Sequence, residues 1–407
     1  MIMSSLELID DLPSHSEPVW TVAFNPVRSF LASCSTDRTI RLFSYILPEG
    51  DGKPVFSLFK VIETNHKRTV RSIGWTPDGK TLASGSFDST VGVWEEVIPE
   101  DASVEEPEGV YQPLDDNGTN MGEKEWECVT TLEGHESECK SVAFSSDGAL
   151  LASCSRDKSV WVWEVQEDSD FECIAVMMEH TQDVKCIAWH PHEEILASAS
   201  YDSHIHLAFD DPESDWCIFQ KLHPSLPASP LTIPTASSPG LIDALVPSKE
   251  EREADEALHV PPLEEDETIW SLAWSPCGRF LASGGDNGGI RLWQRTGSQS
   301  DSSLREIIHT AAHSRSVFSL SWSPSPSPNQ GNLGLLVSGG GDGKLIVWSL
   351  SSDEVGRVEM KPIAAVKGAH GVSDVNSVGW CVREDGKGKG MLSSAGDDGS
   401  VKVWRLV

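Results

Sequence analysis

The feature that most constrains the fold is a 13-residue segment that occurs seven times along the 407-residue chain. The copies are LASCSTDRTIRLF (31–43), LASGSFDSTVGVW (82–94), LASCSRDKSVWVW (151–163), LASASYDSHIHLA (196–208), LASGGDNGGIRLW (281–293), LVSGGGDGKLIVW (336–348) and LSSAGDDGSVKVW (392–404). Each has two apolar-alternating runs around a tight polar turn, which is the pattern of a β-hairpin. One strand precedes each hairpin and another follows it, most clearly at 127–132, 172–177 and 216–222. Four strands per unit and seven units predict an all-β, seven-bladed β-propeller.

The two ends of the chain predict how the ring closes. The seventh copy ends at Trp404, three residues before the last residue, so its unit lacks a fourth strand. Residues 6–12, LELIDDL, form an extra strand pattern before the first complete unit. We therefore expect the N-terminal strand to complete the seventh blade, and residues 1–407 to form a single propeller.

Two long acidic insertions interrupt the repeat. Residues 97–125 and residues 223–267 each carry a net charge of −8, and the second also contains eight prolines. Such segments cannot bury enough apolar surface to order themselves, so we expect both to be disordered loops. The alternative is that they act as acidic interaction tails.

Charge and cysteine content exclude several classes of protein. With 31 basic and 63 acidic side chains the chain has a net charge of −32, which opposes binding to nucleic acid or to an anionic membrane. The chain contains no run of about 18 apolar residues, and its N-terminus, MIMSSLELIDDLP, lacks the features of a secretory signal. We expect a reduced cytoplasmic protein that binds neither nucleic acid nor membrane.

Enzymatic chemistry is not expected. Ser, His and Asp recur around the ring, whereas a hydrolase needs one triad in one cleft. The chain has no G-x-S-x-G elbow, no phosphate-binding loop and no dinucleotide fingerprint, so we predict no catalytic residues and no cofactor.

Metal binding is not expected either. The nine cysteines form no C-x-x-C motif. Their repeated strand positions, Cys34 with Cys154 and Cys128 with Cys173 and Cys217, indicate packing as small apolar side chains. The histidines His190, His192, His204 and His206 lie close in sequence, but exposed strand histidines explain them better than a metal site.

Propeller geometry identifies side chains that face the narrow mouth of the ring. Three positions per unit face the mouth: the residue before the turn Asp, the first residue of the innermost strand, and the residue two places before that. The first set is Thr36, Phe87, Arg156, Tyr201, Asp286, Gly341 and Asp397. The second set is Trp20, Arg71, Lys140, Lys185, Trp270, Phe318 and Asn376.

The mouth is predicted to be electrically asymmetric. The cations Arg71, Lys140, Arg156 and Lys185 fall on blades two to four, whereas Asp286, Asp374 and Asp397 gather on the opposite side. The aromatic residues of the same rim are Phe87, Tyr201, Trp270 and Phe318. A cationic sector beside aromatic side chains suits a short acidic or carboxylate-ended peptide that carries an aromatic residue. The alternative is ordinary surface charge, balanced by Glu138 and Asp183.

The repeats resemble the WD-repeat family over nearly the whole chain. The resemblance implies a structural tetrad in which His bonds the turn Asp and a strand Ser, and the Ser accepts the indole N–H of a Trp. Complete tetrads are His66, Ser84, Asp88 and Trp94; His135, Ser153, Asp157 and Trp163; His313, Ser338, Asp342 and Trp348; and His370, Ser394, Asp398 and Trp404. Three units depart from the pattern: the first has Phe43 and the fourth Ala208 in place of Trp, and the fifth has Asn287 in place of Asp, with His223 as the candidate histidine.

Blades three and four carry a more specific resemblance. The stretch WECVTTLEGHESECKSVAFSSDGALLASCSRDKSVWVWEV (126–165), continued by HTQDVKCIAWHP, is similar to the WD-repeat subunits of the cytosolic iron–sulfur protein assembly (CIA) machinery. The resemblance implies a monomeric, non-enzymatic adaptor that joins a small cysteine-bearing factor and a helical-repeat scaffold in a targeting complex. That complex delivers 4Fe–4S clusters to cytosolic and nuclear apoproteins.

The same resemblance implies roles for particular residues. Arg156 matches a functionally important arginine at the mouth, and some members are thought to recognise client tails that end in an aromatic residue. Leu207, Ala208 and Phe209 stand where animal members carry Leu-Tyr-Arg, a tripeptide proposed to contact the co-chaperone system. This chain therefore departs from the animal pattern at that contact.

Two other classes of propeller remain open. A ubiquitin-ligase substrate receptor typically carries W-D-x-R after the hairpin, and no repeat here contains a Trp-Asp pair. A histone- or chromatin-binding propeller is favoured by the acidic insertions. We predict an interaction scaffold whose partners are iron–sulfur assembly factors and apoproteins.

Overall fold

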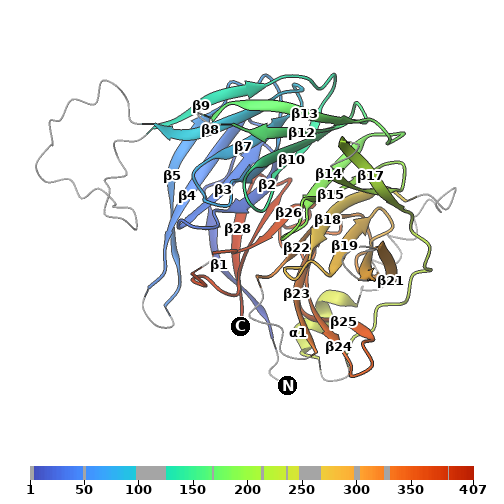
Figure 1. The fold of residues 1–407 in the computed structure, drawn as a ribbon. Helices are drawn as coiled ribbons and strands as arrows, with labels where there is room; N and C mark the ends of the chain where they lie inside the picture. Colours follow the sequence, from blue (N-terminus) through green and yellow to red (C-terminus); the bar gives the residue numbers. More distant parts are fainter. Residues whose placement is uncertain are drawn as a thin grey trace, which may run out of the picture.

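Seven antiparallel sheets of four strands are arranged around a ring (Figure 1). The computed structural model describes residues 4–48, 52–97, 125–166, 169–211, 215–234, 237–246, 267–297, 303–324, 331–383 and 385–407. Every sheet in these ranges is a four-stranded blade, so the predicted all-β, seven-bladed propeller is confirmed.

Each blade contributes one strand to each of four positions, from the central channel to the rim. The innermost strands are β2 (Val19–Phe24), β6 (Val70–Trp75), β10 (Cys139–Phe144), β14 (Val184–Trp189), β18 (Ile269–Trp274), β22 (Val317–Trp322) and β26 (Val375–Trp380). The second strands are β3 (Phe30–Ser35), β7 (Leu82–Ser86), β11 (Leu150–Ser155), β15 (Ile195–Ser200), β19 (Phe280–Gly285), β23 (Asn332–Gly340) and β27 (Met391–Gly396). The third strands are β4 (Thr39–Ile46), β8 (Val91–Val97), β12 (Val160–Val165), β16 (Ile205–Asp211), β20 (Gly289–Thr296), β24 (Leu345–Ser352) and β28 (Val401–Leu406). The outer strands are β5 (Val55–Glu63), β9 (Glu125–Leu132), β13 (Phe171–Met177), β17 (Asp215–Leu222), β21 (Ser303–Ala311), β25 (Val358–Val366) and β1 (Leu6–Leu12).

The hairpin between the second and third strands is built around the turn Asp. The Asp157 carboxylate accepts the backbone N–H of Ser159 at 2.9 Å, and the residue between them, Lys158, has a φ of 75°. The equivalent residue has a positive φ in all seven blades, and it is Gly only in blades five to seven. The Asp side chain closes the turn by accepting the backbone N–H two residues further on, which explains why Asp recurs at this position.

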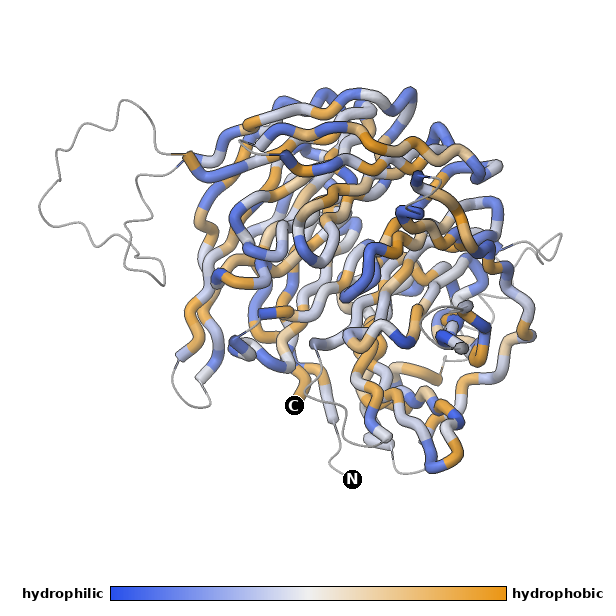
Figure 2. Tube along the Cα trace, in the orientation of Figure 1, coloured by the Kyte–Doolittle hydropathy of each residue, from blue (hydrophilic) through white to orange (hydrophobic). Residues whose placement is uncertain are grey.

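The core is divided among the seven blade interfaces. The described residues form seven hydrophobic clusters, each with members from two neighbouring blades. Figure 2 shows apolar segments distributed along strands around the whole ring rather than at one centre. Because both faces of a blade are covered by neighbours, the second strands are almost wholly buried, as in β3 with six buried residues of six.

The chain ends close the ring as predicted. Strand β1 pairs antiparallel with β28, from Leu6 opposite Leu406 to Leu12 opposite Val401. The two strands lie side by side in Figure 1, although one is the first and the other the last of the chain. Leu12 is 3% exposed and packs with Val19, Val401 and Val403 in the cluster between blades seven and one. The N-terminal strand is therefore the outer strand of the seventh blade.

The expected disorder of the second insertion is wrong for its described part. Residues 223–234 and 237–246, here called the strap, run along the outside of blades five and six. Ser229 bridges the edge of β21 in parallel, and helix α1 (Pro239–Leu245), capped by the Ser238 side chain, buries Leu241 and Leu245 in the cluster between these blades. Sequence-distant apolar contacts order this segment despite its proline content. Residues 247–266, and the first insertion from 98 to 124, lie outside the described residues.

Candidate functional site

The tetrads are formed as hydrogen-bonded chains inside the blades. In blade three the Trp163 indole N–H donates to Ser153 Oγ at 3.2 Å, Ser153 lies 2.9 Å from His135 Nε2, and His135 Nδ1 lies 2.9 Å from Asp157. The Ser hydroxyl accepts from Trp and so donates to His Nε2, which places the imidazole proton on Nδ1, facing the carboxylate. Blades two, six and seven form the same chain with their own four residues.

The turn aspartates are held in the charged form. Burial alone would raise the pKa of Asp157, but hydrogen bonds from His135 and Ser159 outweigh it and lower the pKa below its usual range. The same balance lowers the pKa of the corresponding aspartates of blades one, two, four, six and seven. All four groups of each complete tetrad are thus occupied with one another, so the sets are structural and present no catalytic centre.

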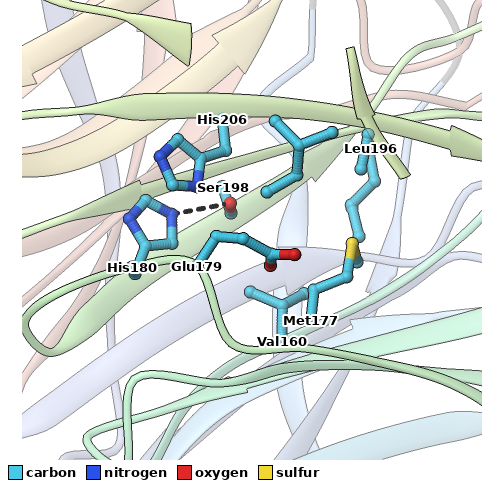
Figure 3. A pocket seen from close by; sticks show the side chains of 9 residues that line it. Val160, Met177, Glu179, His180, Leu196, Ser198 and His206 are labelled. Atoms are coloured by element: carbon cyan, nitrogen blue, oxygen red, sulfur yellow. Dashed lines mark hydrogen bonds between the residues drawn. The ribbon is translucent and has the colours of Figure 1, made fainter. Parts of the chain in front are cut away.

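Blade four replaces the tetrad Trp with Ala208 and rearranges around the loss. His206 stacks flat on His180, with ring centroids 3.8 Å apart, and His180 keeps its bond to Ser198, as Figure 3 shows. A cavity of about 10 Å³ remains beside Ala208, room for at most one water molecule. Burial, followed by the neighbouring His180, lowers the pKa of His206 to about 3.

The interpretation of the clustered histidines as exposed strand residues is wrong, since only His206 lies in a strand and only His192 is exposed. His206 is 3% exposed and His190 is 2% exposed, because both faces of a blade are covered. His190 lies 3.0 Å from the Gly278 carbonyl oxygen, and His192 lies 2.8 Å from that of Pro276. Within the described ranges no group of three or more His, Cys, Asp or Glu side chains is arranged to hold a metal ion.

Among the described residues blade five has no tetrad histidine, and the candidate His223 is wrong. His223 is exposed and lies against the His204 ring, with centroids 4.9 Å apart. Glu267 takes the place of the histidine: its carboxylate accepts the backbone N–H of Asn287 at 3.1 Å and pairs with Arg291 at 3.0 Å. A carboxylate that bonds a guanidinium satisfies this buried turn in place of the imidazole.

The same arginine anchors the strap. Arg291 pairs with Glu306 at 2.6 Å and donates to the Leu226 carbonyl at 3.0 Å, while Glu306 accepts the backbone N–H groups of Ser225 and Leu226. Trp293 still donates to Ser283 at 3.0 Å, so the ion triad Glu267–Arg291–Glu306 replaces only the His–Asp half of the tetrad of blade five, and it also binds the strap. The departure of this repeat from the family pattern has a structural cause.

The predicted inner-strand residues converge on the channel. All seven line one cavity of about 240 Å³: Trp20, Arg71, Lys140, Lys185, Trp270, Phe318 and Asn376. The cations stand on three consecutive blades, and the aromatic side chains on blades one, five and six. We call this cavity the cup.

The cationic sector forms a network with two carboxylates. Glu138 pairs with Arg68 at 2.8 Å, Lys140 at 2.6 Å and Arg156 at 3.7 Å, and Asp183 pairs with Lys185 at 3.4 Å and Arg156 at 4.0 Å. Glu138 and Asp183 are therefore balancing charges, as the alternative interpretation held. Five cations, counting Arg71, face these two carboxylates, so three positive charges remain in excess among the described residues of the sector.

Exposure separates the members of this sector. The Lys140 and Lys185 side chains are 13% and 8% exposed, whereas Arg156 is 58% exposed and Arg68 is 55% exposed. The two arginines are therefore the groups that a partner meets first. Sequence reasoning missed Arg68, and its signal was the position two residues after a tetrad histidine, next to the mouth.

The aromatic residues of the rim are partly covered by the protein's own cations. Lys140 Nζ lies 4.1 Å from the centre of the Phe87 ring, and Lys185 Nζ lies 3.5 Å from that of Tyr201. Trp270 makes edge contacts with Tyr201 and Phe318, and its indole N–H donates to Asp286. These contacts fix the lysines by cation–π attraction, so the rings position the cations as well as adding apolar surface.

The opposite side of the mouth is acidic, as predicted. Asp374 has a raised pKa, first because of burial and also because Asp397 and Asp342 are close. Arg315, 60% exposed, pairs with Asp374 at 3.5 Å, and Asn376 donates to Asp397 at 2.7 Å. The mouth therefore presents a positive and a negative half.

The predicted apolar packing holds for Cys34 and Cys154, which are buried, but it is wrong for the outer strands, where Cys173 is exposed and Cys128 and Cys217 are half-buried. The predicted register also contains one error. Cys128 lies opposite Trp94 and Cys173 opposite Trp163, but Cys217 lies opposite Phe209, one place away from Ala208. Burial raises the pKa of Cys34 and Cys186 to about 12, so these thiols are not thiolates near neutral pH.

Comparison with known proteins agrees with this geometry. The family model "WD domain, G-beta repeat" matches residues 6–44, 53–95, 126–164, 171–207, 259–294, 305–349 and 361–405. The chain is 69% identical, over 100% of both chains, to the "Probable cytosolic iron-sulfur protein assembly protein 1" of Cryptococcus neoformans var. neoformans serotype D. It is 40% identical to the protein of that name from Mycosarcoma maydis (99% of this chain, 94% of the relative) and 35% identical to that from Vanderwaltozyma polyspora (98% and 99%).

The helix content is minimal in the part of the chain that the structure describes. No helix there is long and apolar enough to cross a membrane, since α1 has seven residues. The repeat model covers most of the chain, and several full-length relatives share one name. The chain therefore belongs to the WD-repeat family and, within it, to the family of cytosolic iron–sulfur protein assembly protein 1.

Proposed function

We propose that this chain is a non-enzymatic adaptor in the cytosolic iron–sulfur targeting complex, and that it holds assembly factors and client apoproteins by the cationic sector of its mouth. Its relatives are named as assembly proteins, and a role in cytosolic iron–sulfur protein assembly follows from its family. WD-repeat propellers typically act as binding scaffolds, and the hydrogen-bonded tetrads here lie inside the blades and hold their strands together. Its expected clients are iron–sulfur apoproteins of the cytosol and the nucleus.

The observation that carries this proposal is a local reversal of charge. A chain with a net charge of −32 places Arg68, Arg71, Lys140, Arg156 and Lys185 together at one half of its mouth. Such a sector attracts acidic segments, whereas the acidic surface of the rest of the chain repels them. Glu138 and Asp183 hold the cations in place, so the sector is preorganised for an acidic partner.

Charge reversal at Arg156 tests the site. Arg156→Glu would put a third carboxylate beside Glu138 and Asp183, and we expect partner binding to weaken by about 1–3 kcal/mol, roughly 5- to 150-fold. Arg315→Glu is the matched control, because Arg315 is 60% exposed on the opposite half of the mouth and Arg156 is 58% exposed. Equal melting temperatures would show that both variants fold.

The assay is an affinity purification from cytosol, with the wild type and both variants, followed by mass spectrometry. We expect assembly factors and iron–sulfur apoproteins with the wild type and with Arg315→Glu, and their loss with Arg156→Glu. Undiminished recovery with Arg156→Glu would refute the site. Recovery of histones or ubiquitin-ligase subunits in place of assembly factors would refute the function.

A further inference from the structure

An aliphatic layer lies beneath the polar layer of the cup. Two residues further along each inner strand, a second set of side chains lines the same cavity: Val22, Ile73, Val142, Ile187, Leu272, Leu320 and Val378. Each of these is less than 10% exposed. The cup therefore has its charged and aromatic residues above an apolar floor.

The positive charge of the cup is incompletely balanced. Lys140 and Lys185 each reach one carboxylate, Glu138 and Asp183, at the outer rim. Arg71 forms no ion pair within the described ranges, and its guanidinium stacks on Trp20, 4.7 Å from the ring centre. Burial lowers the pKa of both lysines, and the charge of Arg71 lowers it further. A guanidinium beside an apolar floor without a carboxylate is costly unless an anion joins it.

We propose that the cup binds a compact oxyanion, a phosphate or carboxylate group of a small molecule, between Arg71, Lys140 and Lys185. The planar guanidinium of Arg71 offers a fork of N–H donors that fits two oxygens of such a group, and the lysines add point charges from the next two blades. The volume of about 240 Å³ admits a small polyanion, below the range of drug-sized ligands.

This inference shares Arg71, Lys140 and Lys185 with the cationic sector of the adaptor proposal. Its experiment uses small anions and no protein partner, so the two proposals can fail separately. An anion in the cup would also contact blades two, three and four at once, because each of these blades supplies one of the cations. Ligand binding should therefore raise the melting temperature of the propeller.

The test is calorimetric titration of the full chain at low ionic strength with pyrophosphate and, separately, with citrate. The two probes distinguish a phosphate from a carboxylate ligand. We expect one-to-one binding of at least one probe, weakened by added salt. Arg71→Gln should weaken binding about tenfold or more, as expected for loss of a charge-assisted hydrogen bond, and Lys140→Gln should weaken it in the same direction.

Arg315→Gln is the control, because it removes the same charge from the opposite half of the mouth and should change the affinity by less than about twofold. Arg71→Lys keeps the positive charge but lacks the paired N–H donors of the guanidinium, so it should bind with intermediate affinity. This variant replaces Arg71→Gln in the test if Arg71→Gln does not fold. Failure of both probes to bind the wild type would overturn the proposal. Equal weakening by Arg315→Gln and Arg71→Gln would also overturn it, since the effect would then be one of net charge alone.

Discussion

The serine of the complete tetrads is predicted to bridge two buried groups, and blade one provides a natural comparison. Ser153 Oγ contacts both the Trp163 indole N–H and His135, and Ser153 is completely buried. Ser33 of blade one is equally buried and contacts His15 at 2.8 Å, but Phe43 offers it no N–H. Ser153→Ala therefore leaves two buried polar groups without this hydrogen-bond partner, whereas Ser33→Ala leaves one.

The magnitudes follow from the cost of an unsatisfied buried group, about 1–3 kcal/mol each. Ser153→Ala should lower the free energy of unfolding by about 2–6 kcal/mol, and Ser33→Ala by about 1–3 kcal/mol. In a Trp163→Phe background the indole donor is gone, so Ser153→Ala should cost only about 1–3 kcal/mol, as in blade one. The double-mutant cycle should therefore give a coupling of about 1–3 kcal/mol between Ser153 and Trp163.

The assay is equilibrium urea unfolding followed by far-UV circular dichroism, with reversibility checked for each variant. Far-UV detection avoids the change in fluorescence that Trp163→Phe itself introduces. If Ser153→Ala costs the same in the wild-type and Trp163→Phe backgrounds, the hydroxyl does not bridge the two groups. The hydrogen bonds of the tetrad would then contribute to the free energy of unfolding independently, without coupling between Ser153 and Trp163.

Two further predictions concern ring closure and acid stability. Deletion of residues 1–12 should lower the melting temperature and cause association of the protein, because it exposes the edge of β28. Deletion of residues 1–4 leaves β1 intact and should have little effect. Equal melting temperatures for the two truncated proteins would contradict closure of the ring by β1. The turn aspartates have folded pKa values below the unfolded value of about 3.9, so their stabilisation is complete above that pH and is lost as the pH falls below about 4. Thermal melts between about pH 7 and pH 3 should show this loss, and a shallower slope in Asp157→Asn; a slope unchanged by that substitution would refute the assignment.

The fold was predictable because its signals are local and repeated seven times. The alternating runs, the turn Asp and the pairing of the N-terminal strand with blade seven each depend on residues close in sequence or on the count of strands. The inner-strand residues of the mouth were found for the same reason, since one position per blade faces the channel. Because the hairpin pattern occurs seven times, a signal that is weak in one copy predicts the propeller as a whole.

The parts that sequence could not supply depend on contacts between distant residues. Glu267 substitutes for a histidine only because Arg291 and Glu306 surround it, and Glu306 lies 39 residues further along the chain. The prolines and charge of the strap predict disorder from composition, whereas Leu241 and Leu245 order it by packing on blades five and six. His206 is buried although its strand pattern predicts exposure, because strand alternation does not indicate that a blade is covered on both faces.

Closure of blade seven by both ends of the chain has a consequence for biosynthesis. Strand β1 leaves the ribosome first, but its partner β28 follows about 400 residues later. At about 5–20 residues per second, β1 waits roughly 20–80 s without a partner strand. Its three acidic side chains, Glu7, Asp10 and Asp11, discourage pairing with strands of other nascent chains during this interval. The charge of this strand thus protects the polypeptide while it is being made.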